Sequence, residues 1–218
     1  MNKEWSDLNK TMQQQLKKEA TFGQGIETLL CLRQKLMDEL LDMKKQLNSE
    51  DFSRMPFPNA KGYHCKTIAY SIWHILRIED IVAHSLIQND EEIFFRKGFC
   101  DSIGSPIITT GNELSGQQIA DFSRRLNVNQ LFCYLEEVKM STDMLLKNLS
   151  FGDLKRKFDE MDKERLKLLQ VVSSDENAAW LIDYWCGKNI RGLIQMPFSR
   201  HWIMHVEAGL RIQKGIQK

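Results

Sequence analysis

Residues that interrupt helices are scarce in this sequence. Its 218 residues include 12 glycines and 4 prolines, where average usage would give about 15 and about 11. The prolines fall at three points, Pro56 with Pro58, then Pro106, then Pro197, each among other loop-forming residues. Proline breaks a helix interior, and the sequence between these points is rich in leucine and methionine. We therefore predict an all-α fold, a bundle of helices joined by modest loops.

Hydrophobic periodicity indicates where the helices lie. Apolar residues recur at spacings of three, four and seven, the period of a buried helical stripe. The helices predicted in this way cover the ranges 26–47, 67–87, 127–149, 153–172, 177–195 and 199–215. Ser199 follows Pro197 directly and is predicted to be the N-cap of the last helix.

We predict a single domain over residues 1–218. Residues 1–20 form an N-terminal extension, in which the spacing of Trp5 and Met12 indicates a shorter helix. Residues 90–116 hold several glycines and the Ser105–Pro106 pair, which predicts a long irregular loop.

Charge and composition exclude several classes of protein. Lys plus Arg number 30 and Asp plus Glu number 29, so the chain lacks the excess positive charge that bulk phosphate binding needs, and no nucleic-acid partner is expected. No window of 18 uncharged apolar residues occurs, so no membrane span is expected. The polar first 20 residues do not resemble a secretory signal, which predicts a cytoplasmic protein. Five widely spaced cysteines without a C-x-x-C pair are predicted to be reduced and mostly buried.

Two histidines stand four residues apart near the end of the chain. On a helix, His201 and His205 share one face with Ala208 and Ile212, so both imidazoles are predicted to point into the bundle. A metal ion would satisfy both rings, and hydrogen bonds to backbone or carboxylate groups are the alternative. Trp202 occupies the position of the glutamate in H-E-x-x-H, so a zincin-type protease is not predicted.

A third ligand is expected from another helix. His74 lies at the edge of the apolar face of the helix predicted at 67–87, and it is the best candidate. His84 falls near the polar side of that helix and His64 lies in a loop, so both are predicted to be solvated. Glu79 falls inside the apolar stripe and needs a partner. That partner is either the second ring nitrogen of a ligand histidine or an arginine on a neighbouring helix.

Two segments carry a family resemblance. The stretch Thr67-Ile-Ala-Tyr-Ser-Ile-Trp-His74-Ile-Leu-Arg-Ile-Glu79, preceded by a proline-containing loop, resembles the second helix of the DinB-like (YfiT-like) proteins. The segment Arg200-His-Trp-Ile-Met-His205 resembles the H-x-x-x-H of their last helix. The resemblance covers about residues 20–216. It implies a four-helix bundle, with extra short helices here, in which His74, His201 and His205 hold a divalent metal, and it also implies a homodimer.

The predicted metal site has a definite chemistry. Three neutral imidazoles leave the charge of a zinc, nickel or iron(II) ion uncompensated and one coordination position open, where a water or thiol would ionise readily. The resemblance implies an S-transferase that activates a small thiol such as bacillithiol for attack on a small-molecule substrate. One alternative is a metal-dependent hydrolase. The other is a non-enzymatic helical bundle that a structural metal or a histidine cluster stabilises. Arg77 and Arg200 are candidates for steering an anionic thiol, or else surface salt-bridge residues. Cys186 as a nucleophile is a weaker hypothesis.

Overall fold

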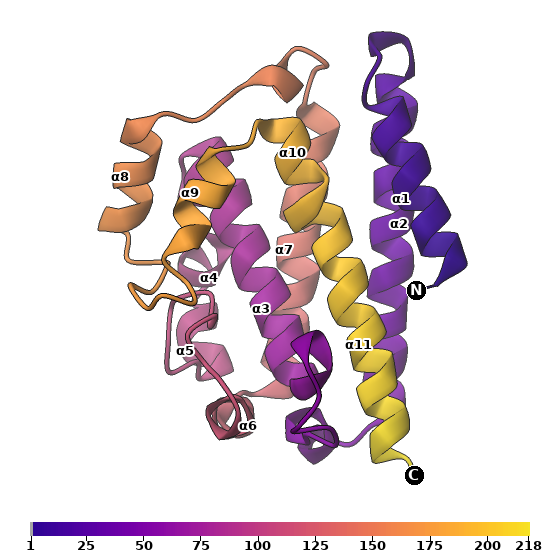
Figure 1. Ribbon diagram of the computed structural model, residues 1–218, viewed down its shortest axis with the longest axis vertical. Helices are drawn as coiled ribbons and strands as arrows, with labels where there is room; N and C mark the ends of the chain where they lie inside the picture. Colours follow the sequence, from indigo (N-terminus) through magenta and orange to yellow (C-terminus); the bar gives the residue numbers. More distant parts are fainter. Residues whose placement is uncertain (1) are drawn as a thin grey trace.

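The computed structural model describes residues 2–218 and is built from helices (Figure 1). Within these residues no strand forms, and the only β-type pairing is an isolated bridge between Lys157 and Asn189. The predicted all-α fold is confirmed. None of the described helices combines the length and the apolar character needed to cross a membrane.

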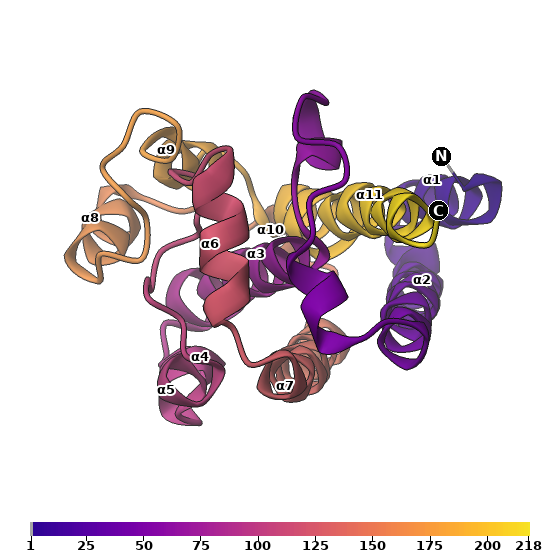
Figure 2. The ribbon, with the colours of Figure 1, turned by 90° about the horizontal axis from the view of Figure 1, so that it is seen from below.

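Four long helices contact one another in a ring. They are α2 (Glu19–Gln46), α3 (Ile68–Asp80), α7 (Val128–Asn148) and α11 (His201–Ile216). Helix α3 packs against α7 and α11, and α2 packs against the same two helices. The end-on view shows α3 between α7 and α11 (Figure 2). The prediction of a helix at 127–149 is confirmed.

Helix α1 (Lys3–Gln15) turns back onto α2 at the N-terminal end of the chain. Trp5 and Met12 are buried in this contact, as their spacing predicted. Gly23 and Gly25 predict that the next helix either starts near Ile26 or is bent there; a start at Ile26 is wrong, because α2 begins at Glu19. Gly25 lies inside α2, where a Cβ would stand 2.8 Å from the Leu16 side chain, so glycine here permits the close approach of the turn.

Two of the long helices continue through π-helical turns. The segment Ile81–Gln88 (η3) extends α3, and Met196–Arg200 (η5) leads without a break into α11. The predicted N-cap at Ser199 is therefore wrong. Its hydroxyl donates to the carbonyl of Ile194 at 2.9 Å, inside a continuous helical stretch that starts earlier.

The segment predicted as an irregular loop at 90–116 is partly helical. Helices α4 (Ile93–Arg96) and α5 (Phe99–Ile103) occupy its first half. The carboxylate of Asp80 accepts the N–H groups of Ile93 at 2.9 Å and Phe94 at 2.8 Å, which satisfies the start of α4. The second half runs irregularly over α3 to α6 (Gln117–Arg125).

The remaining elements are short. Between α2 and α3 lie η1 (Ser49–Ser53) and η2 (Gly62–Cys65). The predicted helix at 153–172 is reduced to η4 (Asp153–Lys155) and α8 (Glu160–Leu168), and the helix at 177–195 is divided. Its two parts are α9 (Trp180–Cys186) and α10 (Ile190–Ile194).

Candidate metal centre

His74 is held in one orientation by the loop that crosses α3. Its Nδ1 lies 2.6 Å from the carbonyl oxygen of Thr110, an acceptor, so Nδ1 carries the proton and Nε2 keeps its lone pair. Tyr70 stacks on the His74 ring with 5.4 Å between centroids, and its hydroxyl donates to the Gly111 carbonyl at 2.8 Å. A backbone carbonyl that fixes the tautomer is the usual support of a metal-ligating histidine.

His201 and His205 meet His74 from the first turns of α11. The His74 ring centroid lies 5.1 Å from that of His201 and 5.0 Å from that of His205, and the two α11 rings are 4.7 Å apart. Both α11 imidazoles are buried. No hydrogen-bond partner exists within the described residues for Nδ1 of His201 or for either ring nitrogen of His205. Buried polar atoms without partners are uncommon, and a bound ion would give one nitrogen of each ring a partner.

The donor set fits a metal ion. One ring nitrogen from each histidine lies within 4.8 Å of the other two. Nitrogens bound to one tetrahedral zinc lie roughly 3.3 Å apart, so each ring would move inward by about 1 Å or less. Burial lowers the pKa of His74 to about 4, and it lowers the pKa values of His201 and His205 well below the usual range. The three rings are therefore neutral at pH 7, with lone pairs available to a cation.

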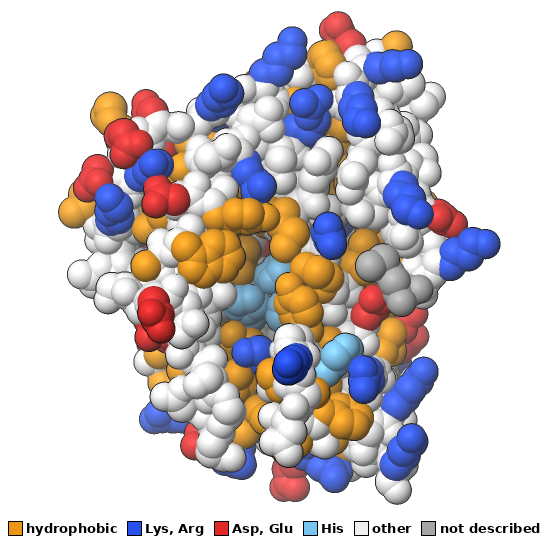
Figure 3. Space-filling model, in the orientation of Figure 1, with side chains coloured by type: hydrophobic (Ala, Val, Ile, Leu, Met, Phe, Trp, Pro, Cys, Tyr) orange, Lys and Arg blue, Asp and Glu red, His pale blue; other side chains and the backbone are white. Residues whose placement is uncertain are grey.

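A pocket of about 240 Å³ opens beside this cluster. His74 and His201 line it together with aromatic and aliphatic residues from α9 and η5. In the space-filling view, pale blue histidine side chains lie in a hollow bordered by hydrophobic side chains (Figure 3). Tyr63 of η2 lines the same pocket and sets its ring edge-on against His205, with 4.7 Å between centroids.

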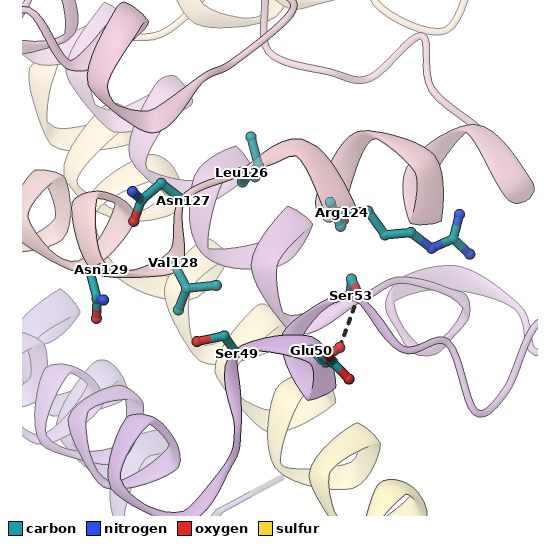
Figure 4. A pocket seen from close by; sticks show the side chains of 9 residues that line it. Ser49, Glu50, Ser53, Arg124, Leu126, Asn127, Val128 and Asn129 are labelled. Atoms are coloured by element: carbon teal, nitrogen blue, oxygen red, sulfur yellow. Dashed lines mark hydrogen bonds between the residues drawn. The ribbon is translucent and has the colours of Figure 1, made fainter.

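A larger pocket lies elsewhere and has a different character. It measures about 510 Å³ and is formed by η1 and the junction of α6 with α7 (Figure 4). Its lining mixes Leu126 and Val128 with Glu50, Arg124 and several serine and asparagine side chains, and no histidine or cysteine lines it. Size alone does not make it the better site, because the histidine pocket unites potential ligands with an apolar wall.

Gly111 is needed for the loop that orients His74. Its φ is +75°, and an added Cβ would stand 2.7 Å from the Trp73 ring. We expect Gly111→Ala to lower the free energy of unfolding by about 1–3 kcal/mol through overpacking and left-handed strain, measured by urea denaturation. Gly98→Ala is the control, because Gly98 has φ +67° and open space around it. Equal losses in the two variants would contradict a role for the contact with Trp73.

Glu79 does not support a ligand histidine, so that expectation is corrected. Its carboxylate forms a two-point ion pair with Arg33 of α2, at 2.7 and 2.8 Å, and accepts the indole N–H of Trp202 at 2.6 Å. The alternative interpretation, an arginine from a neighbouring helix, is the one observed. Trp202 adjoins His201 in α11, so Glu79 fixes the helix that carries the ligands rather than a ligand itself.

Arg77 does not steer a substrate either. Its guanidinium is buried, pairs with Glu92 at 2.8 Å and donates to the Ile108 carbonyl at 2.7 Å. Tyr70, His74 and Arg77 thus anchor three carbonyls of the loop, at Gly111, Thr110 and Ile108. The role of Arg77 is to hold the loop that orients His74.

Arg200 remains beside the site. It is exposed on the turn before His201, and it lies close enough to Tyr63 to oppose the rise in that tyrosine's pKa caused by burial. Lys66, which the sequence did not single out, is the second nearby cation. It is partly buried, and its ammonium group lies over the Tyr70 ring. Burial of the two imidazoles is the largest cause of the lowered pKa values of His74 and His205, and the positive charge of Lys66 lowers them further. The only sequence feature that could have indicated Lys66 was its position close to Tyr63 in the chain.

Other sequence predictions are corrected by burial. His84 is buried rather than solvated, with Nδ1 2.7 Å from Asp90 and Nε2 2.9 Å from Ser141. His64 is half-buried in η2. Cys186 is buried, and desolvation raises its pKa to about 11, which opposes a nucleophilic role. Cys31 and Cys133 are exposed, so burial of the thiols is not general.

Comparison with known proteins adds no relative. No protein-family model matches the sequence, and no curated protein matches it. The chemistry of the site therefore rests on the three histidines, their supports and the pocket beside them.

Proposed function

We propose that this protein is a divalent-metal-dependent enzyme that activates a low-molecular-weight thiol for transfer to an electrophilic small molecule. One observation carries the proposal: three buried, neutral imidazoles with free lone pairs converge from two helices beside a pocket. Zinc, nickel and iron(II) all accept such a donor set. A cation held there would supply a Lewis acid that lowers the pKa of a thiol at its open position.

The number of ligands favours catalysis over a structural staple. Among the described residues, no fourth histidine, cysteine, aspartate or glutamate joins the three histidines. A structural zinc site is normally closed by four protein ligands, whereas a catalytic site keeps one position for water or substrate. The pocket touches His74 and His201, so a small molecule has a route to that position.

The cations near the cluster suit a thiolate. Lys66 is half-buried and Arg200 is exposed. Each lies near a component of the site, Lys66 near His74 and His205, and Arg200 near Tyr63. Their charges would attract an anionic thiol, which is our reason to prefer a thiol to water as the nucleophile.

The placement of the ligands supports the DinB-like assignment that we propose for the bundle. One histidine lies on α3, the second of the four long helices, and two lie four residues apart on α11, the last of them. This is the distribution that the resemblance implies. A homodimer belongs to the same proposal.

Cobalt-loaded protein gives a direct test. We expect 2-mercaptoethanol to produce a saturable sulfur-to-cobalt charge-transfer band in the near ultraviolet, because the three histidines leave a position for the sulfur. His201→Ala should give no such band, since it removes a ligand at the pocket. Met161→Ala is a control on the exposed side of α8, where this side chain is 79% exposed, and it should behave like the wild type. Cobalt binding without any thiol band would overturn the thiol mechanism in favour of a closed or water-based site.

A further inference from the structure

The wall of the histidine pocket is mostly apolar, and besides His74 and His201 its polar lining residue is Asn112. Its aromatic members come from two separate parts of the chain, Tyr63 from η2 and Trp180, Tyr184 and Trp185 from α9. Met196 and Leu181 add aliphatic surface. The ring of Trp180 meets that of Tyr184 edge-on, with 5.5 Å between centroids, and its indole N–H donates to the Asn177 carbonyl at 2.9 Å. Its polar atom is thus engaged by the segment just before α9, and its ring faces remain for packing.

Charge is missing from this wall. In the described part of the chain, none of the residues lining the pocket has a carboxylate, ammonium or guanidinium group. Burying a charged ligand group without a partner is costly. The nearby cations, Lys66 and Arg200, are not among the lining residues. A group packed against the aromatic wall, away from the metal position at His74 and His201, has no charged partner there and is therefore expected to be uncharged.

The dimensions limit the occupant further. The pocket holds about 240 Å³, below the roughly 300–1,000 Å³ of sites for drug-sized ligands. A single ring with its substituents fits this space. Aromatic walls prefer aromatic guests, because edge-to-face and offset contacts add to the burial of apolar area.

We propose that the electrophile carries a small, uncharged aromatic group, which the α9 aromatics and Tyr63 hold beside His74 and His201. The proposal rests on the proposed function and specifies its second substrate. In the reaction, the thiol sulfur forms a bond to the electrophilic carbon, the leaving group departs with its bonding electrons, and the thiol proton passes to solvent. Trp180 is the residue expected to determine specificity, because it is 49% exposed and stands free to contact a guest.

Two thiols of similar acidity serve as probes of the pocket. Benzyl mercaptan carries the proposed ring and 2-mercaptoethanol does not, and both report through the charge-transfer band of cobalt-loaded protein. We expect benzyl mercaptan to bind the wild type about tenfold or more tightly than 2-mercaptoethanol, from burial of the ring. Trp180→Ala should reduce this preference to about threefold or less, with cobalt binding unchanged.

The control and the outcomes separate this inference from the proposed function. Leu168→Ala removes a side chain that is 82% exposed on α8 and does not line the pocket, so it should keep the full preference. Equal affinities of the two thiols for the wild type would overturn the aromatic pocket and leave the thiol site intact. An unchanged preference in Trp180→Ala would overturn the role of Trp180. Failure of cobalt or of both thiols to bind would instead overturn the proposed function itself.

Discussion

Untagged protein loaded with zinc is expected to retain about one metal ion per chain after gel filtration. The variants His74→Ala, His201→Ala and His205→Ala should each lose it. The physical reason is that three neutral imidazoles supply every protein ligand in the cluster, within 4.8 Å of one another. Removing even a supporting residue typically costs 10–100-fold in metal affinity, so loss of a ligand should exceed about 100-fold. Inductively coupled plasma mass spectrometry measures the metal content.

His64→Ala is the matched control for the loss of an imidazole. His64 is half-buried in η2 and does not belong to the cluster, so this variant should hold as much zinc as the wild type. A wild type that takes up no zinc, nickel or iron would remove the metal hypothesis and leave three buried histidines as core residues. Loss of metal from the two α11 variants alone would show that His74 is not the third ligand.

The sequence carried much of this site because helical periodicity also fixes side-chain direction. The four-residue spacing of His201 and His205, in phase with Ala208 and Ile212, placed both imidazoles inside the bundle, and the structure buries them. The position of His74 on the apolar arc of its helix gave the third member. Periodicity shows which face of a helix a residue occupies, and that information was nearly enough to predict where these three imidazoles point.

Contacts between helices were not available from the sequence. Glu79 and Arg77 were both recognised as notable, but their partners lie on α2 and on the segment before α6. Phase on α3 predicted that Glu79 points inward, but it says nothing about which helix packs there, and Arg77 was predicted to steer a thiol or to lie at the surface, whereas it is buried. His84 was misplaced for a related reason: α3 and its π-helical extension are buried on every side, so its polar face meets Asp90 and Ser141 instead of water.

Local signals also failed where the pattern was weak. The charged stretch 153–172 has only a thin apolar seam, and the structure keeps just two turns of helix as α8. Short helices gain little from propensity and depend on what they pack against. The sequence also did not predict the aromatic wall of the pocket. Trp180 and Tyr184 form it together with Tyr63, which lies more than a hundred residues away in the chain.

Breaking the buried pair of Arg33 and Glu79 should destabilise the fold strongly. Both side chains have no exposed surface, and Arg33 also pairs with Asp143 at 2.7 Å and donates to the Phe198 carbonyl at 3.1 Å. We expect Arg33→Met to lower the free energy of unfolding by about 3–5 kcal/mol, because it leaves the Glu79 carboxylate buried with only the Trp202 indole as a donor. Urea denaturation, with the midpoint and slope both fitted, measures the loss.

A double variant separates the coupling between the two charges from the effect of removing each side chain alone. The double variant Arg33→Met with Glu79→Leu removes both charges, so it should lose less stability than the sum of the two single variants. Lys45→Met is the control for a surface pair with Asp42, where exposed fractions of 74% and 56% predict that the urea midpoint hardly changes. Additive losses in the double variant would contradict the coupling. Glu79 also accepts the indole N–H of Trp202, which lies next to His201, so the pair links the stability of the bundle to the geometry of the site. We expect these variants to weaken zinc binding only if they unfold or shift α11.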